Sequence, residues 1–119
     1  MSTKAKLHER LAFSAPGAWV SMADYRQVVA YGAVADTSPD TDVTVQLRKA
    51  TDASGSNATN FGTAVTGPTQ AVAQGYASEL GATAGGVPFT HVSATITGAG
   101  SPAADSSGVV IRGDGRFNP

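Results

Sequence analysis

Two histidines and several clustered acids are the side chains of this sequence that could bind a metal or transfer protons. His8 and His91 have no histidine or cysteine neighbour at ligand spacing, and a metal site needs several ligands. Asp52-x-Ser54-x-Ser56 partly matches a calcium loop, but the glycine at its sixth position and the closing glutamate are missing. We interpret this segment as a polar turn.

Catalytic sets are equally incomplete. Asp36, Asp40 and Asp42 surround a proline-containing turn, whereas a catalytic carboxylate pair needs one member in an apolar pocket. Serines are plentiful, but there is no G-x-S-x-G motif and no histidine placed to act as a base. Residues 112–114 spell the integrin tripeptide RGD, which we interpret as a chance match. The sequence therefore predicts a protein that is not an enzyme and has no metal and no cofactor.

The composition excludes further classes. Charged residues make up 14% of the 119 residues and the net charge is −1, unlike the basic surface of a nucleic-acid-binding domain. No apolar run is long enough to span a membrane, and the first residues lack the apolar region of a signal peptide. With one Trp, three Tyr and four Phe, the core has little bulk, and assembly would add burial. We therefore expect a homo-oligomer.

The elements that would carry these residues are short strands. Residues 41–49 alternate apolar and polar side chains, which is typical of a strand with one buried face. Residues 89–97 alternate in the same way, and residues 26–34 are apolar on both phases, as in a strand buried on both sides. The side chains predicted to face the core are Val43, Val45, Leu47, Val92 and Ile96.

The remaining segments give weaker signals. Residues 61–65 and 69–73 are strand candidates around Gly67-Pro68, residues 109–112 form a last strand, and residues 76–80 fit either a helical turn or a strand. Short strands separated by Gly, Pro, Asp and Ser turns predict an all-β, single-domain β-sandwich or barrel.

Residues 1–24 differ from the rest and suggest an extended N-terminal arm, with a β domain at residues 25–119. The arm starts with basic residues, and spaced large apolar side chains follow, a pattern suited to docking on another surface. In the alternative, Trp19 and Val20 belong to the first strand and only residues 1–14 are loose. The candidate partner-binding residues are Lys4, Lys6, Arg10, Leu11, Phe13 and Trp19, with Arg116 and Phe117 in the C-terminal tail.

Three segments together resemble small structural proteins of tailed bacteriophages. These proteins commonly show V-x-V-x-L-x-Q-A-T-D-A-x-G, then F-x-x-V-x-V-x-V-T, then an apolar strand that ends in an Arg-aromatic-x-Pro tail. The matching residues are Val43, Val45, Leu47, Ala50, Thr51, Asp52, Ala53, Gly55, Phe89, Val92, Ala94, Ile96, Arg116, Phe117 and Pro119. Lys49 stands in place of the motif's Gln, and Ala94 in place of a larger Val.

The resemblance covers about residues 25–119 and implies a virion structural protein. The expected role is a capsid decoration (cement) protein that binds the major capsid protein lattice and stabilises the head. Because such proteins often sit at threefold points of capsids, the resemblance favours a homotrimer, with a dimer possible. It would be made in the host cytoplasm and act on the capsid surface, with neither nucleic acid nor membrane as a partner. A head–tail or tail component is the alternative within the resemblance, and a carbohydrate-binding β module is the alternative outside it.

Overall fold

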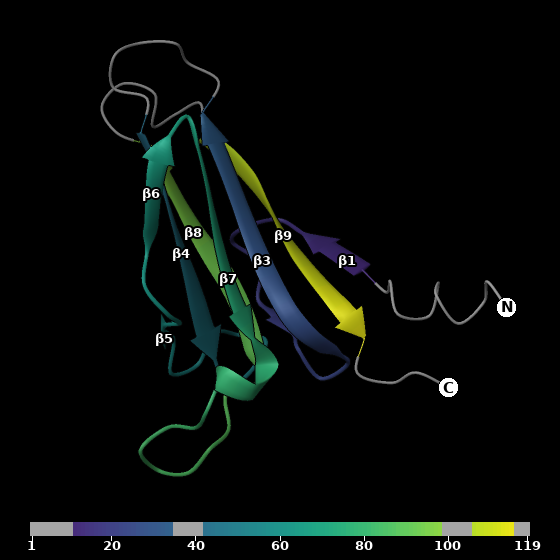
Figure 1. Ribbon diagram of the computed structural model, residues 1–119. Helices are drawn as coiled ribbons and strands as arrows, with labels where there is room; N and C mark the ends of the chain where they lie inside the picture. Colours follow the sequence, from purple (N-terminus) through teal and green to yellow (C-terminus); the bar gives the residue numbers. More distant parts are fainter. Residues whose placement is uncertain (1–10, 35–41, 99–105, 116–119) are drawn as a thin grey trace, which may run out of the picture.

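The computed structural model describes residues 11–34, 42–98 and 106–115, which form two antiparallel β-sheets packed face to face (Figure 1). The fold is therefore an all-β sandwich, as the sequence predicted. We call the four-stranded sheet sheet A and the five-stranded sheet sheet B.

Sheet A has the strand order β1-β9-β3-β7. Its strands are β1 (Leu11–Ser14), β9 (Ser106–Gly115), β3 (Tyr25–Val34) and β7 (Gln70–Tyr76). The long strands β9 and β3 form the centre of the sheet and pair along almost their whole length.

Sheet B has the order β2-β8-β4-β5, and β6 also pairs with β4. Its strands are β2 (Val20–Ser21), β8 (His91–Gly98), β4 (Asp42–Ala50), β5 (Thr59–Asn60) and β6 (Val65–Pro68). A short 3-10 helix, η1 (Ala77–Glu79), follows β7. Of the two alternatives for residues 76–80, the helical turn is therefore confirmed for residues 77–79, whereas Tyr76 is the last residue of β7.

The core is built from small aliphatic side chains on the inner faces of the two sheets. Leu47 and Val92 are almost fully buried, and Ile96 is partly buried against the same cluster, so the predicted strand phase is confirmed. Gly32 lets the sheets approach closely, because a Cβ atom there would lie 2.8 Å from methyl groups of both Val45 and Ile96. The buried core comprises Met22, Val28, Ala30, Val34, Val43, Val45, Leu47, Phe61, Ala71, Ala73, Leu80, Val92, Ala94 and Val110.

Part of the segment assigned to the arm lies within the sandwich. Leu11–Ser14 pairs with β9 at the edge of sheet A, and Val20–Ser21 pairs with β8 at the edge of sheet B. Met22 is only 1% exposed and belongs to the core. The first strand of the described fold therefore begins at Leu11, not at residue 25, because β9 and β8 offer free edges with which these two short segments pair. Met22 in addition fills a core position. Residues 1–10 lie outside the described residues.

Two other sequence predictions are wrong. The strand predicted at residues 61–65 is absent except at Val65, the first residue of β6: Phe61 packs into the core, and Gly62 has a φ of +77°, which interrupts extended backbone. Strand β6 instead runs through Gly67 and Pro68, which is possible because β6 is an edge strand and one side needs no N–H donor. Strand β3 is buried on one face only, since Tyr31 on its outer side is 36% exposed.

Candidate binding surfaces

The outer face of sheet A carries apolar side chains on all four strands, interrupted by glutamines on β3 and β7, and we call it the apolar face. Its side chains form cross-strand rows, one of which joins Phe13, Ile111, Val29 and Gln74. Phe13 is 63% exposed at one edge of the sheet, and Val72 is 48% exposed at the other. The outward positions of this face are Leu11, Phe13, Gln27, Val29, Tyr31, Ala33, Gln70, Val72, Gln74, Tyr76, Val109, Ile111 and Gly113.

No charged side chain occupies these outward positions among the described residues. The polar groups on the face are neutral and bond to one another: the Tyr31 hydroxyl donates to Gln70 Oε1 at 2.9 Å, and Gln27 Nε2 donates to Gln74 Oε1 at 3.4 Å. An outer face of an antiparallel sheet in a small domain usually carries polar side chains that alternate with the buried ones. This face departs from that pattern, and apolar patches of this kind mark contact surfaces.

The outer face of sheet B carries mainly hydroxyl and amide side chains, together with the charged Asp42 and Arg48 of β4, and we call it the hydroxyl face. The Thr44 and Thr66 hydroxyls lie 2.8 Å apart across neighbouring strands, and Gln46 Nε2 donates to the Gly62 carbonyl at 3.1 Å. Thr95 is exposed in the adjacent strand β8. Water can solvate such a face without a protein partner.

One end of the hydroxyl face is covered by the chain itself. The Pro16 carbonyl accepts hydrogen bonds from Ser93 Oγ at 2.6 Å and from the Ala94 N–H at 3.0 Å, and Ser93 is buried. Trp19 lies against the turn after β4: a Cβ atom on Gly55 would lie 2.5 Å from Trp19 Nε1. Gly55 also has a φ of +82°, which favours glycine.

The turn beneath Trp19 is organised by one carboxylate. Asp52 Oδ1 accepts hydrogen bonds from the backbone N–H groups of Ser54 at 2.9 Å and Ser56 at 3.1 Å. The bonds from Ser56, above all, lower the pKa of Asp52 below its usual value, because they stabilise the charged carboxylate. This is the polar turn that the sequence predicted at the calcium-like motif.

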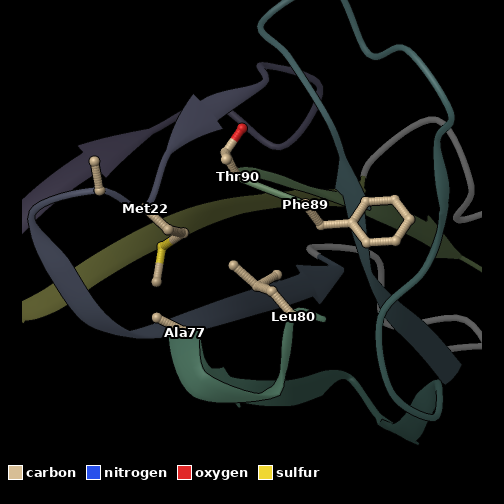
Figure 2. Close-up of a pocket in the computed structure, with 6 residues that line it drawn as sticks. Met22, Ala77, Leu80, Phe89 and Thr90 are labelled. Atoms are coloured by element: carbon tan, nitrogen blue, oxygen red, sulfur yellow. The ribbon is translucent and has the colours of Figure 1, made fainter. Parts of the chain in front are cut away.

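An open apolar hollow lies at the end of the sandwich where η1 meets the turn before β3 (Figure 2). The buried side chains of Met22 and Leu80 lie beside Ala77 in it, and its volume is about 110 Å³. An apolar cavity of about 150 Å³ accepts benzene, so this hollow has the scale of one aliphatic side chain. It is smaller than the roughly 300–1,000 Å³ of small-molecule sites. Its lining is Met22, Ala23, Ala77, Leu80, Phe89 and Thr90.

Lys49 fixes the rim of this hollow. Its Nζ donates to the Leu80 carbonyl at 2.6 Å and lies 4.5 Å from the centre of the Phe89 ring. The ammonium therefore joins β4 to the residues that line the hollow. Val87, on the loop between η1 and β8, is 50% exposed. This end thus presents an apolar hollow together with an exposed apolar side chain.

The structure places the predicted partner-binding residues in two regions. Leu11 and Phe13 lie on the apolar face, while Trp19 is half-buried against Gly55. The other five candidates, Lys4, Lys6, Arg10, Arg116 and Phe117, lie outside the described residues. Sequence reasoning missed most of the apolar face, although the apolar residues on both phases of residues 26–34 were its signal.

The side chains of the described residues that could bind a metal or transfer a proton do not cluster. They include no group of three or more His, Asp or Glu side chains that could hold a metal. His91 Nδ1 lies 2.8 Å from its neighbour's hydroxyl, Thr90 Oγ1. Arg112, the first residue of the RGD sequence, donates from Nη1 to the Ser21 carbonyl at 2.7 Å and stacks on Tyr25 at 4.7 Å. Its guanidinium thus joins sheet A to sheet B.

No protein-family model, curated protein or solved structure matches this chain. The described part of the chain contains no helix that is long and apolar enough to cross a membrane. The surfaces described above are therefore the basis for assigning a function.

Proposed function

We propose that this chain is a non-enzymatic capsid decoration protein of a tailed bacteriophage. It binds the lattice of the major capsid protein and stabilises the head. The observation that carries the proposal is the end of the sandwich where the hollow around Met22 and Leu80 lies. The loop from η1 to β8, which carries the exposed Val87, lies at the same end (Figure 1). The resemblance of residues 25–119 to phage virion proteins supplies the class of partner.

This end of the sandwich suits contact with a protein surface. The hollow can receive one apolar side chain from the lattice, and burial of such a side chain contributes about 1.5–3 kcal/mol. Lys49 holds the surrounding backbone in place through its bond to the Leu80 carbonyl, so the hollow is formed before binding. A preformed site loses less conformational entropy when it binds.

The proposal is tested by adding the purified protein to heads of the same phage that lack it. We expect saturable binding at a fixed number of positions, seen by reconstruction of the particles, and heads that resist heat better after binding. The proposal is wrong if the wild-type protein leaves the heads bare.

Two variants locate the contact. Ala77→Leu fills the hollow, and Val87→Asp places a charge on the loop between η1 and β8. A filled hollow cannot receive a side chain from the lattice, and a charge that the contact buries without a partner costs several kcal/mol. Each variant should therefore weaken binding to heads by at least about tenfold. Thr95→Asp, on the hydroxyl face, is the matched control and should bind like wild type. Equal binding by all three variants would move the contact away from this end.

A further inference from the structure

The apolar face on the outside of sheet A shares no lining residue with the hollow, and no segment of the described chain covers it. At its centre, Val29 pairs with Ile111 and Tyr31 pairs with Val109 across the two longest strands. At its edges stand Phe13 on β1 and Val72 on β7. Exposure of several large apolar side chains to water is unfavourable, since each is worth about 1.5–3 kcal/mol on full burial.

The face is large enough for a stable contact between two protein molecules. With a rise of about 3.3 Å per residue and a strand spacing of about 4.8 Å, its four strands cover roughly 500 Å². Two such faces together bury about 1,000 Å², which reaches the lower limit for a specific interface. The side chains roughen the surface and increase the true contact area.

The chemistry of the face favours a second copy of itself. The described outward positions have no charge, so two copies can meet without like-charge repulsion and without burying an unpaired ion. The chain's own N-terminal residues 1–10 are a poorer cover, because Lys4, Lys6, Glu9 and Arg10 would have to lie on an apolar surface.

We infer that two copies of this chain pack their apolar faces together about a two-fold axis that runs along the strands. Sheets packed face to face keep their strand directions within about 30° of each other, which such an axis allows. β1 of one copy then lies over β7 of the other. A face that meets its own copy makes an isologous contact, which closes at two subunits. The inference therefore selects the dimer over the trimer that the resemblance favoured.

This arrangement goes beyond the proposed capsid role and does not depend on it. An axis along the strands places the hollows of both copies at the same end of the dimer. If the capsid role holds, one dimer makes two equivalent lattice contacts, and the second contact benefits from the high effective concentration set by the first. Self-association is measured on the isolated protein, whereas decoration is measured on particles, so either can fail without the other.

The mass of the full chain in solution tests the dimer. Light scattering at micromolar concentration should give twice the 11.9 kDa of one chain. Val72→Lys and Phe13→Lys each place a charge at an exposed edge of the apolar face, and they should weaken the dimer by at least about tenfold. Thr95→Lys, on the hydroxyl face, should remain dimeric. Circular dichroism should show that all three variants stay folded.

Several results overturn the inference. A monomeric or trimeric wild type contradicts the two-fold contact. A dimer that Thr95→Lys dissociates, and that Val72→Lys and Phe13→Lys do not, places the interface on the other sheet.

Cross-linking tests the direction of the axis, and the chain has no cysteine to interfere. Phe13→Cys and Gln74→Cys are the two ends of one cross-strand row. With the axis along the strands, a mixture of the two variants should form heterodimers that a short bis-maleimide joins, while neither variant should join to itself. Efficient cross-linking of Phe13→Cys to itself would show an axis across the strands.

Discussion

The outer faces of sheets A and B come from strands of the same kind, yet they have opposite chemistry. On the apolar face the outward side chains include Val29, Val72 and Ile111, whereas the hydroxyl face has Thr44 and Thr95 at comparable positions. Valine, isoleucine and threonine are all branched at Cβ and all favour extended backbone. Side-chain shape thus builds both sheets equally, while polarity decides whether water or protein covers each face.

The two faces also differ in what the chain itself covers. The Pro16 carbonyl and Trp19 close one end of the hydroxyl face, where Ser93 is buried. No comparable segment of the described chain crosses the apolar face, where Phe13 is 63% exposed. Sheet B is therefore completed within one chain, and sheet A is completed by a second copy in our proposal.

The largest change in unfolding free energy is expected on the inner side of sheet B, and the outer side of the same sheet provides the comparison. Leu47→Ala should lower the free energy of unfolding by about 2–5 kcal/mol, because Leu47 is 1% exposed in the core. Thr95→Ala, on the hydroxyl face of the adjacent strand, should change it by less than about 0.5 kcal/mol. Urea denaturation of both variants gives the comparison. Similar losses for the two would mean that the hydroxyl face is as buried as the core.

The sequence predicted sheet B better than sheet A because only sheet B shows a clean alternation. In residues 41–49 each valine is followed by a polar residue, so the alternation predicts which side chains face the core. In residues 26–34 the outward Val29 and Tyr31 are as apolar as the inward Val28, and periodicity cannot distinguish a second buried face from an exposed apolar one.

The short edge strands and the hollow could not be predicted from the sequence, for a different reason. Leu11–Ser14 is a strand because β9 offers a free edge, and that edge is created by residues about a hundred positions later. The hollow likewise joins Met22 to Leu80 and Phe89, which periodicity cannot place together. Long-range pairing, rather than local propensity, determines both features.

A loss of stability of intermediate size is expected where Trp19 covers one end of the hydroxyl face. Gly55→Ala would strain a backbone with φ of +82° and would place a methyl group against Trp19. We expect a loss of about 1–3 kcal/mol in unfolding free energy. Trp19 is the single tryptophan, so its fluorescence should shift to longer wavelength as water reaches the ring. Gly17→Ala is the control, because a Cβ atom at Gly17 would meet no other atom within 4 Å. An unchanged emission spectrum in Gly55→Ala would show that Trp19 does not depend on this turn.

The smallest effect concerns the charge that organises the same turn. Asp52→Asn keeps an oxygen acceptor for the Ser54 and Ser56 N–H groups but removes the negative charge that strengthens those bonds. The folded-state pKa of Asp52 is lowered, so the carboxylate stabilises the fold above its unfolded pKa, about 3.9, and this contribution is lost as the pH falls through the lower folded value. Asp52→Asn should therefore melt slightly below wild type at pH 7, and the difference in Tm should shrink below about pH 4. Because the side chain is exposed, salt should reduce the difference at pH 7 as well. Thermal melts from pH 7 to pH 2.5 provide the measurement, and a Tm difference that stays constant across this range would show that the charge of Asp52 does not hold the turn beneath Trp19.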